Sequence, residues 1–136
     1  MSNRREHDAA GAIAGGASVL ASAMAAGRSP SFGELLGGVL SGVVTSRLPD
    51  ALEPATHPGH RRLAHSTVAL GATSWAAPRL HRTHVALATA AERETDPVRR
   101  FLAQMAGGAT VGAAGGYASH LMLDATTPKG LPLLGV

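Results

Sequence analysis

The chain has no cysteine, a single lysine and very few aromatic residues. Without cysteine, disulfides, thiolate nucleophiles and zinc-thiolate sites are all excluded, so a bound metal must use histidine nitrogen and carboxylate oxygen. Aromatics make up 3% of the residues while glycine occurs 17 times. The interior must therefore be built from small and aliphatic side chains, which favours close approach between helices.

Positive charge comes almost wholly from arginine, because Lys129 is the only lysine and the formal net charge is +3. The arginine fork suits phosphate and anionic head groups, although a solvated basic surface explains the same composition equally well. No combination of basic and aromatic residues typical of a nucleic-acid platform is present. We therefore expect no direct nucleic-acid binding.

The spacing of apolar residues and breakers predicts an all-α fold, and the 136 residues of the chain form one domain, 1–136. We expect a compact bundle of about five helices with Gly/Ala-rich packing, embedded in a membrane or associated with one. The expected helices cover residues 9–27, 33–48, 60 or 61–76, 80–92 and 98–125.

Local signals set these boundaries. Ser31 and Glu34 form a predicted capping box, and Asp96 or Thr95 before Pro97 marks another helix start. Pro49 is expected to end the second helix and to open an irregular loop over residues 50–59. A further proline, at position 78, is expected to end the third helix.

Residues 9–27 carry no charge and are long enough to span a bilayer. Alanine and glycine contribute little transfer energy, however, so a tightly packed soluble helix explains this segment equally well. A cleavable signal peptide is less consistent with it, because the Leu-rich centre is missing.

Histidines and acids gather in two short stretches, residues 50–65 and 120–124. His120 and Asp124 are four residues apart, so on a helix they share a face and could share a cation. An ordinary helix-surface hydrogen bond explains the spacing alone. Both residues nevertheless interrupt an uncharged stretch, where burial without partners would be costly.

His60 and His65 do not align on a regular helix, so a shared site requires His60 at the helix entrance and His65 over the first turn. Asp50 and Glu53 enter the same region from the preceding loop, as ligands, as a metal bridge or as a general base. Turn formation is the alternative for both carboxylates.

The remaining histidines are less informative. His57 is interpreted as a loop residue, and His81 and His84 as surface residues of an arginine-containing helix. His7 stands before the first apolar segment, where its ring could fold over the end of the bundle, although a terminal histidine could equally be disordered.

Three ordered motifs resemble a known family. They are Leu48-Pro49-Asp50, His60-Arg61-x-x-x-His65-Ser66, and Ser119-His120-x-x-x-Asp124-x-x-Thr127-Pro128-x-Gly130-x-Pro132-Leu133-Leu134. The chain resembles the YdjM-like family of LexA-binding, inner-membrane-associated proteins, which are predicted to be metal-dependent hydrolases. The His/Asp scheme is similar to that of zinc-dependent phospholipase C and related single-strand nucleases.

The resemblance implies hydrolysis of a phosphoester, either a phospholipid or a nucleotide phosphodiester, at the bacterial inner membrane or its cytoplasmic face. It implies a divalent metal, Zn²⁺ or Mn²⁺, with one to three ions. The implied ligands are His7, Asp50, His60, His65, His120 and Asp124. Arg61 would meet a phosphate oxygen, and Asp50 or Glu53 would orient water or act as base.

The alternative is a non-catalytic, membrane-associated helical assembly or a protein-binding module with a structural metal site. Small-residue faces favour self-association into a homo-oligomer. A LexA-type partner is implied by the resemblance alone. If the chain is instead an enzyme, its partner would be the phosphoester substrate or a membrane lipid.

Overall fold

The computed structural model describes residues 4–53, 64–126 and 131, and every regular element in these ranges is a helix. The four long helices are α1 (Arg4–Ala25), α2 (Phe32–Thr45), α4 (Thr67–Arg93) and α5 (Pro97–Ala125), and α3 (Leu48–Leu52) is a short one. The all-α prediction is confirmed. The expected number of about five helices is close to the observed number, but several helix boundaries differ from those expected.

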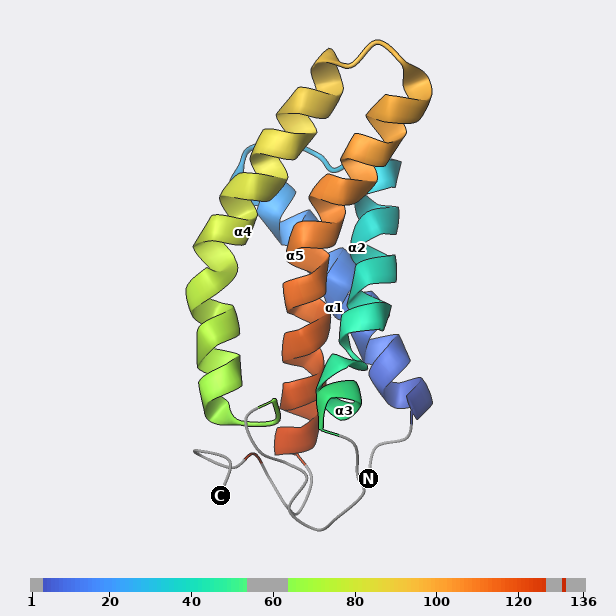
Figure 1. The fold of residues 1–136 in the computed structure, drawn as a ribbon. Helices are drawn as coiled ribbons and strands as arrows, with labels where there is room; N and C mark the ends of the chain where they lie inside the picture. The colour runs from blue at the N-terminus through green and yellow to red at the C-terminus, as the bar shows by residue number, and fades with distance from the viewer. Residues whose placement is uncertain (1–3, 54–63, 127–130, 132–136) are drawn as a thin grey trace.

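Helix α5 is the centre of the bundle. It packs against α1, α2 and α4, and α1 also packs closely against α2. Helix α4 lies mainly beside α5, and the two form a long hairpin (Figure 1). The first turn of α1, the short α3 and the last turns of α5 therefore come to the same end of the molecule.

Glycine lets α1, α2 and α5 approach one another at backbone distance. A Cβ atom on Gly42 of α2 would lie 2.2 Å from the Gly11 carbonyl oxygen of α1. A Cβ atom on Gly108 of α5 would lie 1.9 Å from the Glu34 carbonyl oxygen of α2. These separations leave no room for a side chain, which confirms the predicted small-residue packing.

Large apolar side chains lie mostly on the outside of this bundle, whereas the buried apolar residues are few and mostly small. Leu121, Val19 and Val111 are buried together with several alanines. The exposed large apolar residues include Ile13, Met24, Phe32, Val44, Leu52, Trp75, Val98, Leu102 and Met122. This distribution is the reverse of that in an ordinary water-soluble core, where large aliphatic side chains fill the interior.

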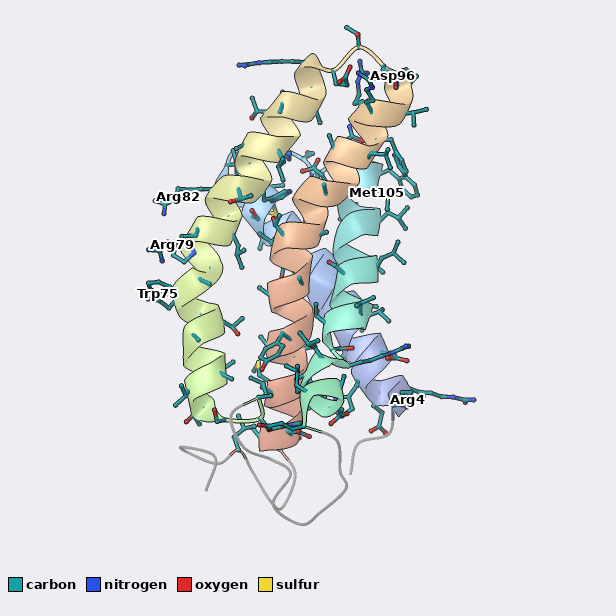
Figure 2. All side chains as sticks on the ribbon, viewed as in Figure 1. Arg4, Trp75, Arg79, Arg82, Asp96 and Met105 are labelled. Atoms are coloured by element: carbon teal, nitrogen blue, oxygen red, sulfur yellow. The ribbon has the colours of Figure 1, made fainter. Side chains whose placement is uncertain are left out.

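The outer face of α4 illustrates the arrangement. Trp75, Arg79 and Arg82 project away from the other helices (Figure 2). The Arg79 guanidinium carbon lies 4.1 Å from the centroid of the Trp75 ring, a cation–π contact. This face presents an aromatic ring and positive charge side by side.

Helix ends follow the predicted capping chemistry. The Ser31 side chain accepts from the Glu34 backbone N–H while the Glu34 carboxylate accepts from the Ser31 backbone N–H, so the capping box is confirmed. Asp96 caps α5 ahead of Pro97, as expected. Helix α1 ends at Ala25 and is followed by Gly27, whose φ of 70° is accompanied by a bond from the Arg28 N–H to the Ala23 carbonyl.

The expected break at Pro78 is wrong, because the two helices predicted on either side are the single helix α4. Proline lacks an N–H and so removes one bond, the one to the Ser74 carbonyl, at a cost of about 3 kcal/mol in a helix interior. Pro78 and Ser74 both lie on the exposed side, where the carbonyl need not be buried. Beyond the proline, His84, Ala88 and Ala91 of α4 are buried in the bundle.

Two further boundaries are corrected near the predicted site. Pro49 does not end a helix: it occupies the first turn of α3, where a missing N–H costs nothing, and Asp50 is helical rather than in a loop. Helix α4 begins at Thr67 with Ser66 as its N-cap, not at His60 or Arg61. His65 therefore stands before the helix rather than over its first turn.

Candidate metal centre

Five of the predicted ligands lie together at one end of the bundle. His7 comes from the first turns of α1, Asp50 from α3, and His120 and Asp124 from the last turns of α5, while His65 directly precedes the cap of α4. Figure 1 shows these segments converging at the end where the described part of the chain begins. Residues far apart in sequence are thus brought to one place by the packing of α1 against α5.

His65, His120 and Asp124 form one compact group, with one ligand atom from each within 4.8 Å of the others. The Nε2 atoms of the two histidines are 3.3 Å apart. Asp124 Oδ2 lies 3.4 Å from Nε2 of His120 and 3.7 Å from Nε2 of His65. All three side chains are buried.

A second group contains His7, Asp50 and, again, His120, also within 4.8 Å. The rings of His7 and His120 are stacked with their centroids 4.0 Å apart. Asp50 Oδ1 lies 3.7 Å from Nε2 of His120 and 3.2 Å from Nε2 of His65. Asp50 joins the two groups, and its side chain is 63% exposed.

The hydrogen bonds made by the other ring nitrogens decide which atoms can bind a cation. His120 Nδ1 lies 2.5 Å from the Ser46 carbonyl oxygen, which can only accept, so this nitrogen carries the hydrogen and Nε2 keeps its lone pair. His65 Nδ1 donates in the same way to Glu53 Oε2 at 3.1 Å. In the neutral tautomer with its hydrogen on Nδ1, His65 keeps the Nε2 lone pair, and the two Nε2 atoms then face each other, an arrangement that a cation between them stabilises.

The donor set therefore fits a divalent metal. It consists of imidazole nitrogen and carboxylate oxygen, the ligands that zinc and manganese accept in the absence of cysteine. The histidine nitrogens that face away from the site bind a carbonyl and a carboxylate, which is the usual support of a metal-bound histidine. His65, His120 and Asp124, with Asp50 and His7 beside them, are the residues that could hold the ion.

Burial lowers the pKa of His7, and the neighbouring His120 lowers it further, while Asp124, Asp50 and Glu6 act in the opposite direction. The ring is therefore neutral near pH 7. A neutral imidazole is the form that can bind a metal.

Glu53 lies behind His65 rather than beside the facing Nε2 atoms. Its second oxygen, Oε1, accepts from the Ala64 backbone N–H at 3.1 Å, and the Tyr117 hydroxyl donates to the Ala64 carbonyl at 2.8 Å. Burial and then the Glu53 charge raise the pKa of Tyr117, so its hydroxyl stays protonated and can donate. These bonds fix the turn that carries His65.

A pocket of about 420 Å³ adjoins Glu53. The side chains around it are largely aliphatic: Leu52, Ala64, Val68, Ala69 and Ala72, with Tyr117 and Glu53. The pocket therefore offers an apolar space next to the support of His65.

The other predicted residues fall in different places. His60 and Arg61, as well as His57, lie outside the described residues. The predicted ligands that are described meet at one end of the bundle.

The interpretation of His81 and His84 as surface residues is wrong for His84, which is fully buried, and incomplete for His81, which is half-buried. Both hydrogen-bond to Ser22 of α1, and His84 also bonds to Glu34. A sequence signal was present: the buried positions 84, 88 and 91 follow the i, i+4, i+7 spacing of one helix face.

The fold and this site define a class: an all-helical protein with small-residue packing, large apolar side chains outside and a buried His/Asp group that could hold a metal ion. The chain belongs to the YdjM inner membrane protein family, whose model matches residues 1–135. Comparisons with curated proteins and with solved structures give no match.

Membership places the chain at the inner membrane. Among the described residues, α1 alone is long and apolar enough to cross a membrane, judged by length and composition. The exposed apolar side chains agree with this setting, because lipid rather than water would then surround them.

Proposed function

We propose that the chain is a metal-dependent hydrolase of phosphoesters, acting at the end of the bundle where α1, α3 and α5 meet. The observation that supports this most directly is the convergence of His65, His120 and Asp124, with both histidines oriented by acceptors on their Nδ1 atoms. A bound divalent ion would lower the pKa of a water molecule and neutralise charge on the phosphate.

The residues of the chain then have distinct roles. His65, His120 and Asp124 hold the ion, and Asp50, which is exposed next to both imidazoles, orients the attacking water. Glu53 is bonded to His65 and to the Ala64 N–H, so we give it an orienting role instead of the role of base. Arg61 as the phosphate-binding residue stays a prediction.

The substrate class follows from the surroundings of Glu53. The adjoining pocket of about 420 Å³ has mostly aliphatic walls, which suits a hydrocarbon group better than a nucleobase and sugar. The exposed apolar residues of the bundle support access from lipid. A phospholipid is therefore favoured over a nucleotide phosphodiester.

This proposal is tested by metal content and turnover of the full chain, purified in detergent without a histidine tag. His120→Ala and Asp124→Asn should each lose bound divalent metal and reduce hydrolysis of bis-p-nitrophenyl phosphate and phospholipid by about 10²-fold or more. Glu92→Gln, an exposed carboxylate on α4, is the matched control and should behave as wild type. Full turnover in Asp124→Asn would exclude this assignment.

The second candidate is a non-catalytic membrane assembly with a structural ion. The backbone-to-backbone contacts at Gly42 and Gly108 favour it, because such packing serves rigid association. A tightly bound metal in wild type without turnover of any phosphodiester or phospholipid would support this function in place of hydrolysis.

A further inference from the structure

A second polar cluster joins three helices away from the metal centre. Ser22 Oγ of α1 lies 2.7 Å from Nδ1 of His84 in α4, and Nε2 of His84 lies 2.8 Å from Oε1 of Glu34 in α2. The three side chains are buried, with relative exposures of 8%, 0% and 3%. A hydroxyl, an imidazole and a carboxylate are thus linked in series by hydrogen bonds.

The direction of these hydrogen bonds follows from Glu34. Burial raises its pKa, but hydrogen bonds from Ser31 and His84 and the charge of Arg28 outweigh this effect and bring the pKa below its usual value. The ionised carboxylate can only accept, so His84 donates through Nε2 and its Nδ1 keeps a lone pair. The Ser22 hydroxyl therefore donates to His84.

His81 completes the environment of the serine. Its Nδ1 lies 2.8 Å from Ser22 Oγ, and because the hydroxyl hydrogen is directed to His84, His81 is the donor in this contact. An N–H directed at the serine oxygen is well placed to move to the oxyanion that forms on the carbon to which that oxygen becomes bonded.

Ser22 and His81 also line a cavity of about 340 Å³ between α1, α4 and α5. Its other walls are largely aliphatic, including Ala21, Ala77, Leu80, Val111 and Ala114. This volume is at the small end of ligand pockets, which span about 300–1,000 Å³. The cavity suits a short apolar chain.

The cavity and the metal centre are separate. Ser22 and His7 are both in α1 and lie 15 residues apart, which corresponds to about 22 Å along a helix. None of the residues around Ser22 belongs to the candidate ligand groups. Any chemistry at Ser22 is thus independent of the hydrolase proposed above.

We propose that Ser22, His84 and Glu34 form a serine nucleophile site that accepts the acyl group of a short apolar ester. A nucleophile in hydrogen-bond contact with a base, which a third group orients, is the arrangement that such chemistry needs. Ser22 is the nucleophile and His84 the base, whereas Glu34 is a positioning residue. His81 supplies the hydrogen bond to the oxyanion.

The reaction balances with ester and water alone. Ser22 Oγ attacks the ester carbonyl carbon as its proton passes to His84 Nδ1, and the imidazolium is stabilised by the Glu34 carboxylate. The ester C–O bond then breaks and the leaving alkoxide takes the proton from His84. Water attacks the acyl-serine by the same route, restores the hydroxyl and releases the carboxylic acid.

The test uses the full chain in detergent and a fluorophosphonate carrying a short alkyl chain. This probe forms a bond between Ser22 Oγ and phosphorus and releases fluoride, and mass spectrometry of the digested protein locates the adduct. We expect labelling of Ser22 in wild type, with or without chelator, and none in Ser22→Ala. Ser18→Ala, which changes another serine of the same cavity, should label as wild type.

Kinetics distinguish the positioning role of Glu34 from a packing role. Glu34→Gln should lower the maximal rate of labelling by about 10²-fold while leaving the inhibition constant unchanged, because the cavity itself is intact. A weakened inhibition constant with an unchanged maximal rate would overturn this role.

Wild type alone can decide the main proposal, so a variant that fails to fold does not obscure it. Folded wild-type protein that gains no adduct at Ser22 would show that the cluster is only structural. Adducts on Ser18 at the same rate as on Ser22 would likewise overturn the proposal, since they would show no special reactivity at Ser22.

Discussion

At the scale of single residues, the orientation of His65 depends on Glu53. The carboxylate accepts from His65 Nδ1 and from the Ala64 N–H, so one side chain fixes both the ring and the turn that carries it. Partners of this kind contribute strongly to metal affinity although they do not touch the ion.

We expect Glu53→Gln to weaken divalent metal affinity by about 10- to 100-fold, because a neutral amide is a poorer acceptor for the His65 N–H. Titration against a chromophoric chelator measures this affinity. Glu92→Gln again serves as control. Equal affinity in Glu53→Gln and wild type would mean that the turn is held without this carboxylate.

A second residue-scale prediction concerns the surface pair of Asp8 and Arg47. Arg47 donates to both Asp8 oxygens, at 2.6 and 2.7 Å, and this hydrogen bonding followed by the arginine charge lowers the Asp8 pKa. A carboxyl with a lower pKa in the folded state stabilises the fold above its unfolded pKa of about 3.9 and ceases to do so as pH falls through the folded value.

Asp8→Asn should therefore lower the urea midpoint near pH 7 but have little effect near pH 2, so its stability should vary less with pH than that of wild type. Denaturant unfolding followed by circular dichroism at the two pH values measures the difference. High salt should reduce it, because the pair is on the surface. An identical loss at both pH values would point to packing instead of charge.

The histidines show which site residues could be predicted from the sequence and which could not. The family resemblance implied the five described residues that meet at the bundle end, and the spacing of His120 and Asp124 was itself typical of metal ligands on a helix. Ser22 and Glu34 carried no such spacing, because their partner His84 comes from a distant helix. Only packing of three helices brings these groups together.

At the scale of helices, glycine determines how closely α2 and α5 approach. The hypothetical Cβ of Gly108 would meet backbone atoms of Glu34, which cannot move aside as a side chain could. Gly71 of α4, by contrast, has nothing within 4 Å of its hypothetical Cβ. The two positions form a matched pair with opposite expectations.

Gly108→Ala should lower the free energy of unfolding by about 1 to 3 kcal/mol or more through overpacking. Gly71→Ala should raise it by about 0.5 to 1 kcal/mol, because alanine restricts the unfolded chain and favours the helix. Unfolding in mixed detergent, followed by circular dichroism, measures both. Similar effects of the two substitutions would contradict the close contact at Gly108.

Helix boundaries that depend on capping residues could be predicted from the sequence. Boundaries that depend on packing between helices could not. The capping box of Ser31 and Glu34 and the Asp96-Pro97 start were read directly from residue types. Pro78 is a breaker by residue type, but α4 continues through it and buries His84, Ala88 and Ala91 further along. Tertiary contact therefore outweighed the local signal.

At the scale of the whole molecule, composition predicted that helices pack through small residues, but it did not predict which residues face outward and which are buried. Scarce aromatics and abundant glycine indicated small-residue contacts, which the bundle has. Composition did not predict that large apolar residues such as Trp75 and Met122 would face outward while His84 and Glu34 are buried. That inversion depends on which helix faces meet.

His120 belongs to both candidate ligand groups, yet it has one nitrogen to give, because its Nδ1 is bonded to the Ser46 carbonyl. A single lone pair serves a single ion. Within the described part of the chain, the two groups share this nitrogen, and Asp50 lies near the imidazoles of both His65 and His120. A cation held there would have buried ligands on the side of His65 and Asp124 and the exposed carboxylate of Asp50 on another, so water would reach it from the side of Asp50.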